Sequence, residues 1–437
     1  MQLRKVLQKT AIVAMTCLMA LTPVVMGGVK VSADTNIDES SINIKAKSAI
    51  AVDAETGQII YGQNENEPLA AASMTKILSA YLVLEAVHNG KLKWNQKIPV
   101  RSAAQKVSQD TSLSNVPLKS DHEYTVRSLY QATLIYSANG AIMALGDAIA
   151  GSQKNFVNMM RKKARSFGIK DAKIYTCNGL PNGLLGKGAY PGIPADAENE
   201  FSARDMAIMA TRLLKDYPEV LKTTKIQHKK FNNGTSYTVM NNWNWMLPGL
   251  VKAYTALPVD GLKTGTSDKA KACFTGTVKK DGHRIITVVM GASHKSQTDL
   301  SRFVETQKLM SYVYNSFTYK TIKKGTKIKG AAVKVETGKE ETAPIVTGKK
   351  THIWVRNDLT PKYQATTKIS KDLVVDHKLQ APVDEGEKVG TMTIKVKGQD
   401  NKNINGAKGV QVKAVAKEDI KKANIFVRMW RGITNIF

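Results

Sequence analysis

The amino-acid sequence predicts an α+β protein: an antiparallel sheet with helices, followed by a small all-β domain and a C-terminal amphipathic helix. Three observations lead to this prediction. Up to residue 318, β-rich runs at both ends of the segment enclose several helical stretches. From 319 to 415 helical periodicity disappears, and short β-rich runs alternate with Gly, Asn, Asp and Pro. Helical spacing returns over residues 416–437.

The N-terminus has the pattern of a secretory signal peptide over residues 1–33. Basic residues within the first nine positions precede an apolar run over 11–29, and residues 31–33 read Val-Ser-Ala, which suits a signal peptidase. The alternative is an uncleaved membrane helix, because the run approaches spanning length. Both interpretations place the rest of the chain outside the cytoplasm, so we expect an exported protein.

Residues 34–318 are predicted to form the first folded domain. A hairpin is expected over 48–62, where two β-rich runs flank Glu55-Thr56-Gly57, and a second over 272–291. Helices are predicted over residues 69–88, 126–150, 154–167, 202–215 and 299–317. Because the two hairpins lie at opposite ends of the segment, the sheet is expected to assemble from sequence-distant strands.

The segments after residue 318 are predicted to form an all-β domain over 319–415 and an amphipathic helix over 416–437. On a helical wheel one side of this helix gathers Ala423, Phe426, Met429, Trp430, Ile433 and Phe437. The opposite side gathers Lys421, Asn424, Arg428, Arg431 and Asn435. This pattern predicts an anchor that lies on a membrane surface. The alternative is a helix packed on its own β-domain.

The net charge of +28 predicts a polyanionic neighbour, and the residues after position 319 contribute 25 basic and 12 acidic side chains. Nucleic acid is not expected, because the chain carries an export signal and lacks a basic motif interleaved with aromatic residues. Anionic lipid and acidic wall polymers fit the export signal better.

No metal and no cofactor are expected. The seven histidines are scattered, without an HExxH motif or ligand spacing on a helix face. Of the three cysteines, Cys17 lies in the signal, and Cys177 and Cys273 are too few for a disulfide framework. We expect the latter two to be small buried thiols.

The segment Ser73-Met-Thr-Lys76 is the first motif with chemical potential. One helical turn separates Ser73 from Lys76, so the lysine amine can reach the hydroxyl. A serine becomes a nucleophile when a base removes its proton, and a lysine whose pKa is lowered by burial and nearby cations can be that base. Ser-x-x-Lys occurs once in the chain.

Two further motifs follow, each weak by itself. Ser137-Ala-Asn139 lies between apolar helical runs, although Ser-x-Asn also occurs at 41–43. Lys263-Thr264-Gly265 lies just before the second hairpin. There a cation and a hydroxyl on a strand edge suit a carboxylate, and the glycine allows an extended peptide to approach. Either motif alone is also compatible with a solvated surface cluster.

In chain order, the three motifs reproduce the signature of the penicillin-recognising serine enzymes. The chain resembles the low-molecular-weight penicillin-binding proteins of the serine-type D-alanyl-D-alanine carboxypeptidase family over about residues 45–437. Further matches are residues 201–206, residues 286–291 and Arg302-Phe-Val-Glu305. The resemblance implies a β-lactamase/transpeptidase-like catalytic domain.

The resemblance also implies a two-step acyl transfer on peptidoglycan stem peptides that end in D-Ala-D-Ala. Ser73 would attack the carbonyl between the two D-alanines while Lys76 takes its proton. Ser137 would relay that proton to the leaving D-alanine, and Asn139 would bind a substrate amide. Water would then release the acyl group. A β-lactam would mimic the substrate and be trapped at Ser73.

The third motif and its surroundings would bind the substrate, again by resemblance. Lys263 would add positive potential that keeps Lys76 neutral, and Gly265 completes the motif. Thr264, with Thr266 and Arg302, would hold the terminal carboxylate. The backbone N–H groups of Ser73 and Thr266 would form the oxyanion hole.

Two departures from the family pattern leave the shape of the cleft open: Ala138 replaces a common glycine, and residues 176–178 read Thr-Cys-Asn.

Other functions also remain open. A class A β-lactamase would need a second base, and no Glu-x-x-Leu-Asn loop is found. An endopeptidase or transpeptidase would share the same site. A non-catalytic wall-binding protein is disfavoured by the intact motifs.

Overall fold

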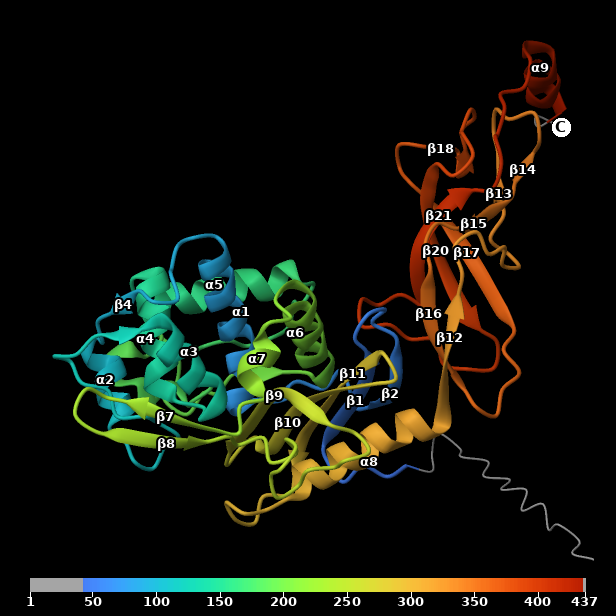
Figure 1. The fold of residues 1–437 in the computed structure, drawn as a ribbon. Helices are drawn as coiled ribbons and strands as arrows, with labels where there is room; N and C mark the ends of the chain where they lie inside the picture. The colour runs from blue at the N-terminus through green and yellow to red at the C-terminus, as the bar shows by residue number, and fades with distance from the viewer. Residues whose placement is uncertain (1–41, 435–437) are drawn as a thin grey trace, which may run out of the picture. The chain divides into compact units, whose positions relative to one another are not determined.

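The computed structural model describes residues 42–434, so the predicted signal peptide over 1–33 lies outside the described residues. The architecture is α+β, as predicted (Figure 1). Its principal sheet has five antiparallel strands in the order β2-β1-β11-β10-β9. These strands are β1 (Ser48–Asp53), β2 (Ile59–Gln63), β9 (Val259–Ser267), β10 (Lys271–Lys280) and β11 (His283–Ala292).

The sheet joins the two ends of the catalytic segment. Both predicted hairpins are present, β1 with β2 and β10 with β11. They meet because β1 pairs with β11, where Ser48 lies opposite Met290. All six residues of β1 are buried, which requires that both faces of the sheet be covered.

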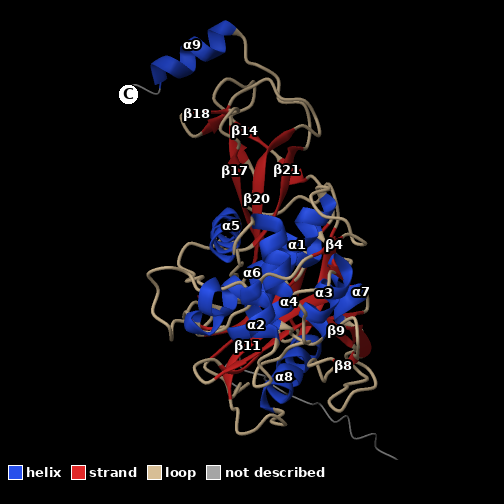
Figure 2. Ribbon diagram, turned by 90° about the vertical axis from the view of Figure 1, so that its left-hand side faces the viewer, coloured by secondary structure: helices blue, strands red, loops and turns tan. Residues whose placement is uncertain are grey.

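Helices cover the sheet on two sides (Figures 1 and 2). Ala49 and Ala51 pack in one apolar cluster with Phe303 of α8 (Ser301–Ser316), whereas the alternating residues Ile50 and Val52 pack in the cluster of the other helices. Those helices are α1 (Lys76–His88), α2 (Ser102–Ser108), α3 (Val126–Ile135), α4 (Asn139–Ala150), α5 (Gln153–Ser166), α6 (Ala203–Asp216) and α7 (Val220–Thr224).

Short elements complete this part of the chain. They are β3 (Leu69–Ala70), η2 (Ala72–Thr75), β4 (Lys97–Ile98), β5 (Tyr124–Thr125), η3 (Asn182–Gly188), β6 (Glu200–Phe201), β7 (His228–Asn232) and β8 (Tyr237–Asn241). The strands pair as β3–β6, β4–β5 and β7–β8.

Two predicted helices differ from the structure: one begins later than expected, and the other is divided in two. The helix expected over 69–88 begins at Lys76, because Leu69 and Ala70 pair with β6 and Ala72 takes a φ of 45° before the η2 turn. The helix expected over 126–150 is divided into α3 and α4 by Ser137, whose φ is 62°. Both interruptions occur at a predicted motif.

The all-β domain begins with β12 (Phe317–Ile322), which pairs with β16 (Thr351–Arg356). Its larger sheet has the order β15-β21-β20-β17. Those strands are β15 (Ile345–Thr347), β17 (Tyr363–Ile369), β20 (Lys388–Val396) and β21 (Val410–Ala416). The small pairs are β13 (Val333–Lys334) with β14 (Thr342–Ala343), and β18 (Val374–Val375) with β19 (Lys378–Leu379).

The terminal helix is shorter than the predicted 416–437. Ala416 is the last residue of β21, and Ala423 is buried, with its N–H donating to the Thr337 carbonyl. The helix α9 runs over Ile425–Thr434. Residues 417–423 therefore belong to the β-domain, because the backbone groups of Lys417, Ile420, Lys421 and Ala423 form hydrogen bonds with it.

Trp354 of β16 contacts the first hairpin. Its backbone N–H donates to Gln58 Oε1 (2.8 Å), and its carbonyl accepts from Gln58 Nε2 (2.9 Å). Its indole Nε1–H donates to Asp53 Oδ2 (2.9 Å). The two domains are thus joined by hydrogen bonds among buried groups.

The described residues contain no helix that is both long and apolar enough to cross a membrane. Cys177 and Cys273 are free and buried, which confirms the prediction of two buried thiols.

Candidate active site

Ser73 lies on the η2 turn immediately before α1. The turn is tightly enclosed: a Cβ on Gly179 would lie 1.8 Å from the Ala72 carbonyl oxygen, and one on Gly265 would lie 2.5 Å from the Ala71 carbonyl oxygen. Both glycines are therefore required for the backbone to pass this close to the serine. Ala72 itself has a positive φ, a conformation that is costly for a side-chain-bearing residue and common at functional sites.

Lys76 is the first residue of α1 and is fully buried. Its Nζ lies 2.8 Å from Ser73 Oγ, 2.7 Å from Asn139 Oδ1 and 2.7 Å from the Asn178 carbonyl oxygen. Burial, and then the charge of Lys263, hold the pKa of Lys76 well below its usual range. A neutral amine at this position has a lone pair with which it can accept the Ser73 proton.

Asn139 and Ser137 are positioned at the junction of α3 and α4. The Asn139 Nδ2 donates to the Ser114 carbonyl (3.0 Å), which orients its Oδ1 toward Lys76. The backbone N–H groups of Asn139 and Gly140 both donate to Asn115 Oδ1 (3.1 and 3.0 Å). The loop between α2 and β5 therefore fixes the second motif, and Ser137 lines the adjoining cavity.

The third motif lies on β9, the edge strand of the principal sheet. Lys263 is buried, and its Nζ donates to the Thr264 carbonyl (2.9 Å). Burial, and then the Arg302 guanidinium, lower the pKa of Lys263 to about 7. Thr264, Gly265 and Thr266 line the cavity, whereas the Lys263 side chain stays in the protein wall behind it.

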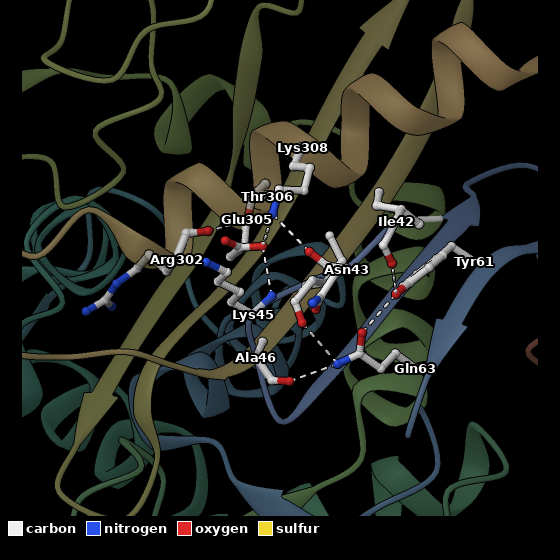
Figure 3. Close-up of polar contacts among 11 residues, drawn as sticks. Ile42, Asn43, Lys45, Ala46, Tyr61, Gln63, Arg302, Glu305, Thr306 and Lys308 are labelled. Carbon is white, nitrogen blue, oxygen red and sulfur yellow. Dashed lines mark hydrogen bonds and ion pairs between the residues drawn. The ribbon is translucent and has the colours of Figure 1, made fainter. Parts of the chain in front are cut away.

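Arg302 reaches the site from α8. Its Nη1 donates to the carbonyl oxygens of Gly265 (2.8 Å) and Cys273 (3.3 Å). One turn along the helix, the buried Glu305 accepts from the Lys45 N–H (2.9 Å) and pairs with Lys308 Nζ (3.0 Å). Figure 3 shows Arg302 extending away from this Glu305 cluster. Glu305 thus anchors the helix on one side while Arg302 enters the cavity on the other.

The first, second and third motifs meet at one cavity of about 240 Å³. It is lined by Ser73, Ser137, Asn139, Thr264, Gly265, Thr266 and Arg302, all predicted from sequence, and by Ser112, Leu113, Ser114, Leu180, Trp243, Trp245, His294, Gln297, Asp299 and Phe303. A second cavity of about 320 Å³, between α3 and the β7–β8 hairpin, has no serine hydrogen-bonded to a lysine. Of these two cavities, the smaller one contains a serine that is hydrogen-bonded to a lysine.

Several contributors were not predicted. Asn178 contributes its backbone carbonyl to the site, so no side-chain pattern identifies it. Trp243 and Trp245 form an aromatic wall: Trp243 stacks on Tyr136 and donates its Nε1–H to the Tyr136 carbonyl (3.2 Å). In the sequence, this aromatic wall is indicated by the Trp-Asn-Trp segment at residues 243–245.

Residues 42–434 contain no group of three or more His, Cys, Asp and Glu side chains that could hold a metal ion. The cavity and its wall bring together a serine, two lysines of lowered pKa and several hydroxyl and amide groups.

Comparisons with known proteins identify both domains. The model of the D-alanyl-D-alanine carboxypeptidase family matches residues 34–294, and that of the penicillin-binding protein 5 C-terminal domain matches residues 317–422. The D-alanyl-D-alanine carboxypeptidase DacF of Bacillus subtilis is 31% identical over 393 residues, which cover 90% of each chain.

Solved structures of penicillin-binding proteins are also similar to this chain. A peptidoglycan synthesis regulatory factor (PBP3) of Streptococcus pneumoniae is similar with a TM-score of 0.69 and 35% identity, covering 87% of this chain and 100% of the other. Penicillin-binding protein D2 of Listeria monocytogenes in its cefotaxime-bound form has a TM-score of 0.50 and 28% identity, covering 62% of this chain and 97% of the other.

Proposed function

Because the chain belongs to the serine-type D-alanyl-D-alanine carboxypeptidase family of penicillin-binding proteins, we propose that it removes the terminal D-alanine of peptidoglycan stem peptides through an acyl-enzyme on Ser73. The observation that carries this assignment is the 2.8 Å contact of Ser73 Oγ with the buried amine of Lys76. Burial keeps that amine available as a base, so the hydroxyl has a proton acceptor in place.

Acylation begins when Ser73 Oγ attacks the carbonyl carbon between the two terminal D-alanines and Lys76 Nζ takes its proton. The oxyanion is held by the backbone N–H groups of Ser73 and Thr266. As the C–N bond breaks, the leaving amine receives the proton from Lys76 through the Ser137 hydroxyl. The departing D-alanine leaves an ester on Ser73.

Deacylation repeats the steps with water. Lys76 accepts a proton from the attacking water, the ester C–O bond breaks, and Ser73 Oγ regains the proton. During the earlier acylation step, Thr264, Thr266 and Arg302 hold the carboxylate of the terminal D-alanine, and Asn139 holds a substrate amide. Arg302 is well placed for this role, because it lines the cavity and its Nη1 is fixed on the Gly265 carbonyl.

The test is incubation of the mature protein and its Ser73→Ala variant with a fluorescent penicillin, followed by intact mass and by D-alanine release from a D-Ala-D-Ala peptide. A stable adduct and D-alanine release, both absent from the variant, are expected. Rapid loss of the penicillin without an adduct would indicate a β-lactamase. An intact penicillin and no adduct would indicate a non-catalytic wall-binding protein.

The same assay separates the enzymes that share this site. An endopeptidase would cleave cross-linked stem peptides faster than it releases terminal D-alanine. A transpeptidase would transfer the acyl group to an added amine in preference to water.

We also propose that α9 holds the exported enzyme at the outer face of the cytoplasmic membrane. Its large apolar residues are exposed, with Phe426 at 77% and Trp430 at 68%, and Ile425 and Met429 are exposed beside them. Exposed aromatic and aliphatic residues on a short basic helix fit insertion at a lipid interface, whereas a helix packed on its own domain would cover them.

Deletion of residues 425–437 tests this anchor. Sedimentation with phosphatidylglycerol vesicles is expected to fall at least tenfold, while D-alanine release from a soluble peptide stays unchanged. The double variant Phe426→Ser with Trp430→Ser is expected to reproduce the loss without shortening the chain. Undiminished sedimentation of either variant would rule out α9 as the anchor.

A further inference from the structure

The outer face of the larger β-domain sheet carries a cationic surface. Its side chains point outward from the three adjacent strands β17, β20 and β21, and each is exposed or partly exposed. They are Gln364, Thr366, Lys368, Thr391, Thr393, Lys395, Gln411 and Lys413. We call this set the cationic face. The alternating residues Ala365, Met392 and Val412 are buried in the domain core, so the eight lie on the opposite side.

The strand register arranges the cationic face in three rows. Reading across the strands, the rows are Lys368–Thr391–Lys413, Thr366–Thr393–Gln411 and Gln364–Lys395. With strands about 4.8 Å apart and same-face residues about 7 Å apart, the rows span a patch of roughly 10 Å by 14 Å. A patch of this size can contact several units of an extended polymer at once.

Positive charge on this face is not neutralised by the protein. No Asp or Glu occurs in β15, β17, β20 or β21. Among the described residues, none of Lys368, Lys395 and Lys413 forms an ion pair. The exposed Lys349 and Lys350 extend the charge beyond β21, because the N–H of the preceding Gly348 donates to the Lys413 carbonyl (2.7 Å). The face therefore attracts anions.

The other side chains of the face are polar. Within residues 42–434 the hydroxyls of Thr366, Thr391 and Thr393 have no protein partner, so they can donate to a ligand oxygen. The face has no apolar side chain, in contrast to α9. A lipid interface requires apolar insertion, so a hydrated polymer fits this surface better than a bilayer does. The three strands contain lysine but no arginine, and a lysine binds phosphate as a point charge.

We propose that the cationic face binds a linear polyanion with phosphodiester groups, which holds the enzyme beside an acidic polymer independently of its active site. The lysines contact successive phosphates, and the threonine hydroxyls donate to phosphate oxygens between them. The all-β domain thus has a binding function that does not depend on acyl transfer.

The test uses the full mature chain and a soluble, lipid-free poly(glycerol phosphate), titrated calorimetrically at several salt concentrations. The face variant replaces Lys368, Lys395 and Lys413 by Gln. The control variant, with the same loss of charge, replaces the exposed Lys154, Lys162 and Lys215 by Gln. Both variants are checked for an unchanged thermal midpoint and unchanged D-alanine release from a soluble peptide.

The parent is expected to bind with an affinity that falls steeply with salt. The face variant is expected to bind roughly 10- to 100-fold more weakly, with a salt slope reduced by about 2, whereas the control stays within about twofold. Equal losses of affinity in both variants would show that only net charge matters and would overturn the proposal. Unchanged binding of the face variant to the polymer would also overturn it. If the face variant binds the polymer normally but phosphatidylglycerol vesicles more weakly, the face binds lipid instead.

Discussion

Near the Ser73 hydroxyl, three basic side chains follow one another: Lys76, Lys263 and Arg302. Arg302 lowers the pKa of Lys263, and Lys263 lowers that of Lys76. Burial is the largest cause of the lowered pKa of both lysines. We expect acylation to require a neutral Lys76 as the base and a charged Lys263 beside it.

This ordering predicts a shift in the alkaline limb of acylation. In the parent, the second-order rate of acylation by a penicillin is expected to fall as pH rises through about 7, where Lys263 loses its charge. Arg302→Gln removes a positive neighbour, so the pKa of Lys263 rises and the limb moves to higher pH. Arg212→Gln, outside the cavity, is the control. An unmoved limb in Arg302→Gln would contradict the assignment.

The backbone at Ser137 leads to a second residue-scale prediction. Its φ of 62° favours glycine, which pays no Cβ penalty there. Ser137→Gly is therefore expected to be more stable than Ser137→Ala by about 1 kcal/mol in urea unfolding. Both variants should lose acylation equally, because both lack the hydroxyl. Equal stability of the two would mean that the backbone at position 137 is relaxed.

At the scale of elements, the η2 turn depends on the loop after residue 176. Gly179→Ala would drive a methyl group into the Ala72 carbonyl, 1.8 Å away, and the positive φ of Gly179 adds strain. Acylation is expected to fall at least tenfold, as the turn that carries Ser73 shifts. The matched control is Gly90→Ala, which has a similar φ but no neighbour within 4 Å.

The two variants separate backbone strain from displacement of the turn. Gly90→Ala should lose about 1 kcal/mol of stability with normal acylation. If Gly179→Ala also acylates normally, the loop does not position the nucleophile.

Elements fixed by local pattern could be predicted, and elements fixed by distant partners could not. The helix expected over 154–167 is found at Gln153–Ser166, because its caps and apolar spacing lie in the sequence itself. The break at Ser137 is stabilised from far away: the Trp243 N–H donates to the Ile135 carbonyl (3.4 Å). No window around residue 137 contains that information.

The same distinction applies to the site. Spacing was enough to place Ser73 beside Lys76, whereas Asn139 was joined to them by the resemblance of the three motifs to a known family. The Asn178 carbonyl, in contrast, is a backbone group, and every residue offers one. The error at the C-terminus has a related cause. Residues 417–423 have helical spacing, but the β-domain supplies their backbone hydrogen-bond partners, and these outweigh the local preference.

At the scale of the whole molecule, the contact between the domains depends on a buried carboxylate. Burial raises the pKa of Asp53 above its ordinary 3.8, and the Trp354 hydrogen bond opposes that rise. The folded state therefore binds the Asp53 proton more tightly than the unfolded state, and stability falls as pH rises above 3.8.

Trp354→Phe removes the hydrogen bond, so the pKa of Asp53 is expected to rise further. The variant should lose about 2 kcal/mol at neutral pH and progressively less as acid protonates the carboxylate. Thermal midpoints of parent and variant, compared across pH 4 to 8, measure this difference. Tyr314→Phe, which removes a hydrogen bond to a neutral carbonyl (2.9 Å), is the control. A pH-independent difference would show that Asp53 is not the group involved.

The pairing of β1 with β11 also sets the order in which this chain can fold. The strand nearest the start of the described chain, β1, lies between β2 and β11, and its partner residue Met290 on β11 is made only after all the helices from α1 to α7. A chain emerging from a ribosome or a membrane pore therefore has no complete sheet to build on until β11 is out. Loops this long are closed slowly. We expect the nascent chain to pass through a narrow channel before its sheet is complete, and Ser73 lacks its neighbouring strand β9 until residue 267 has been made.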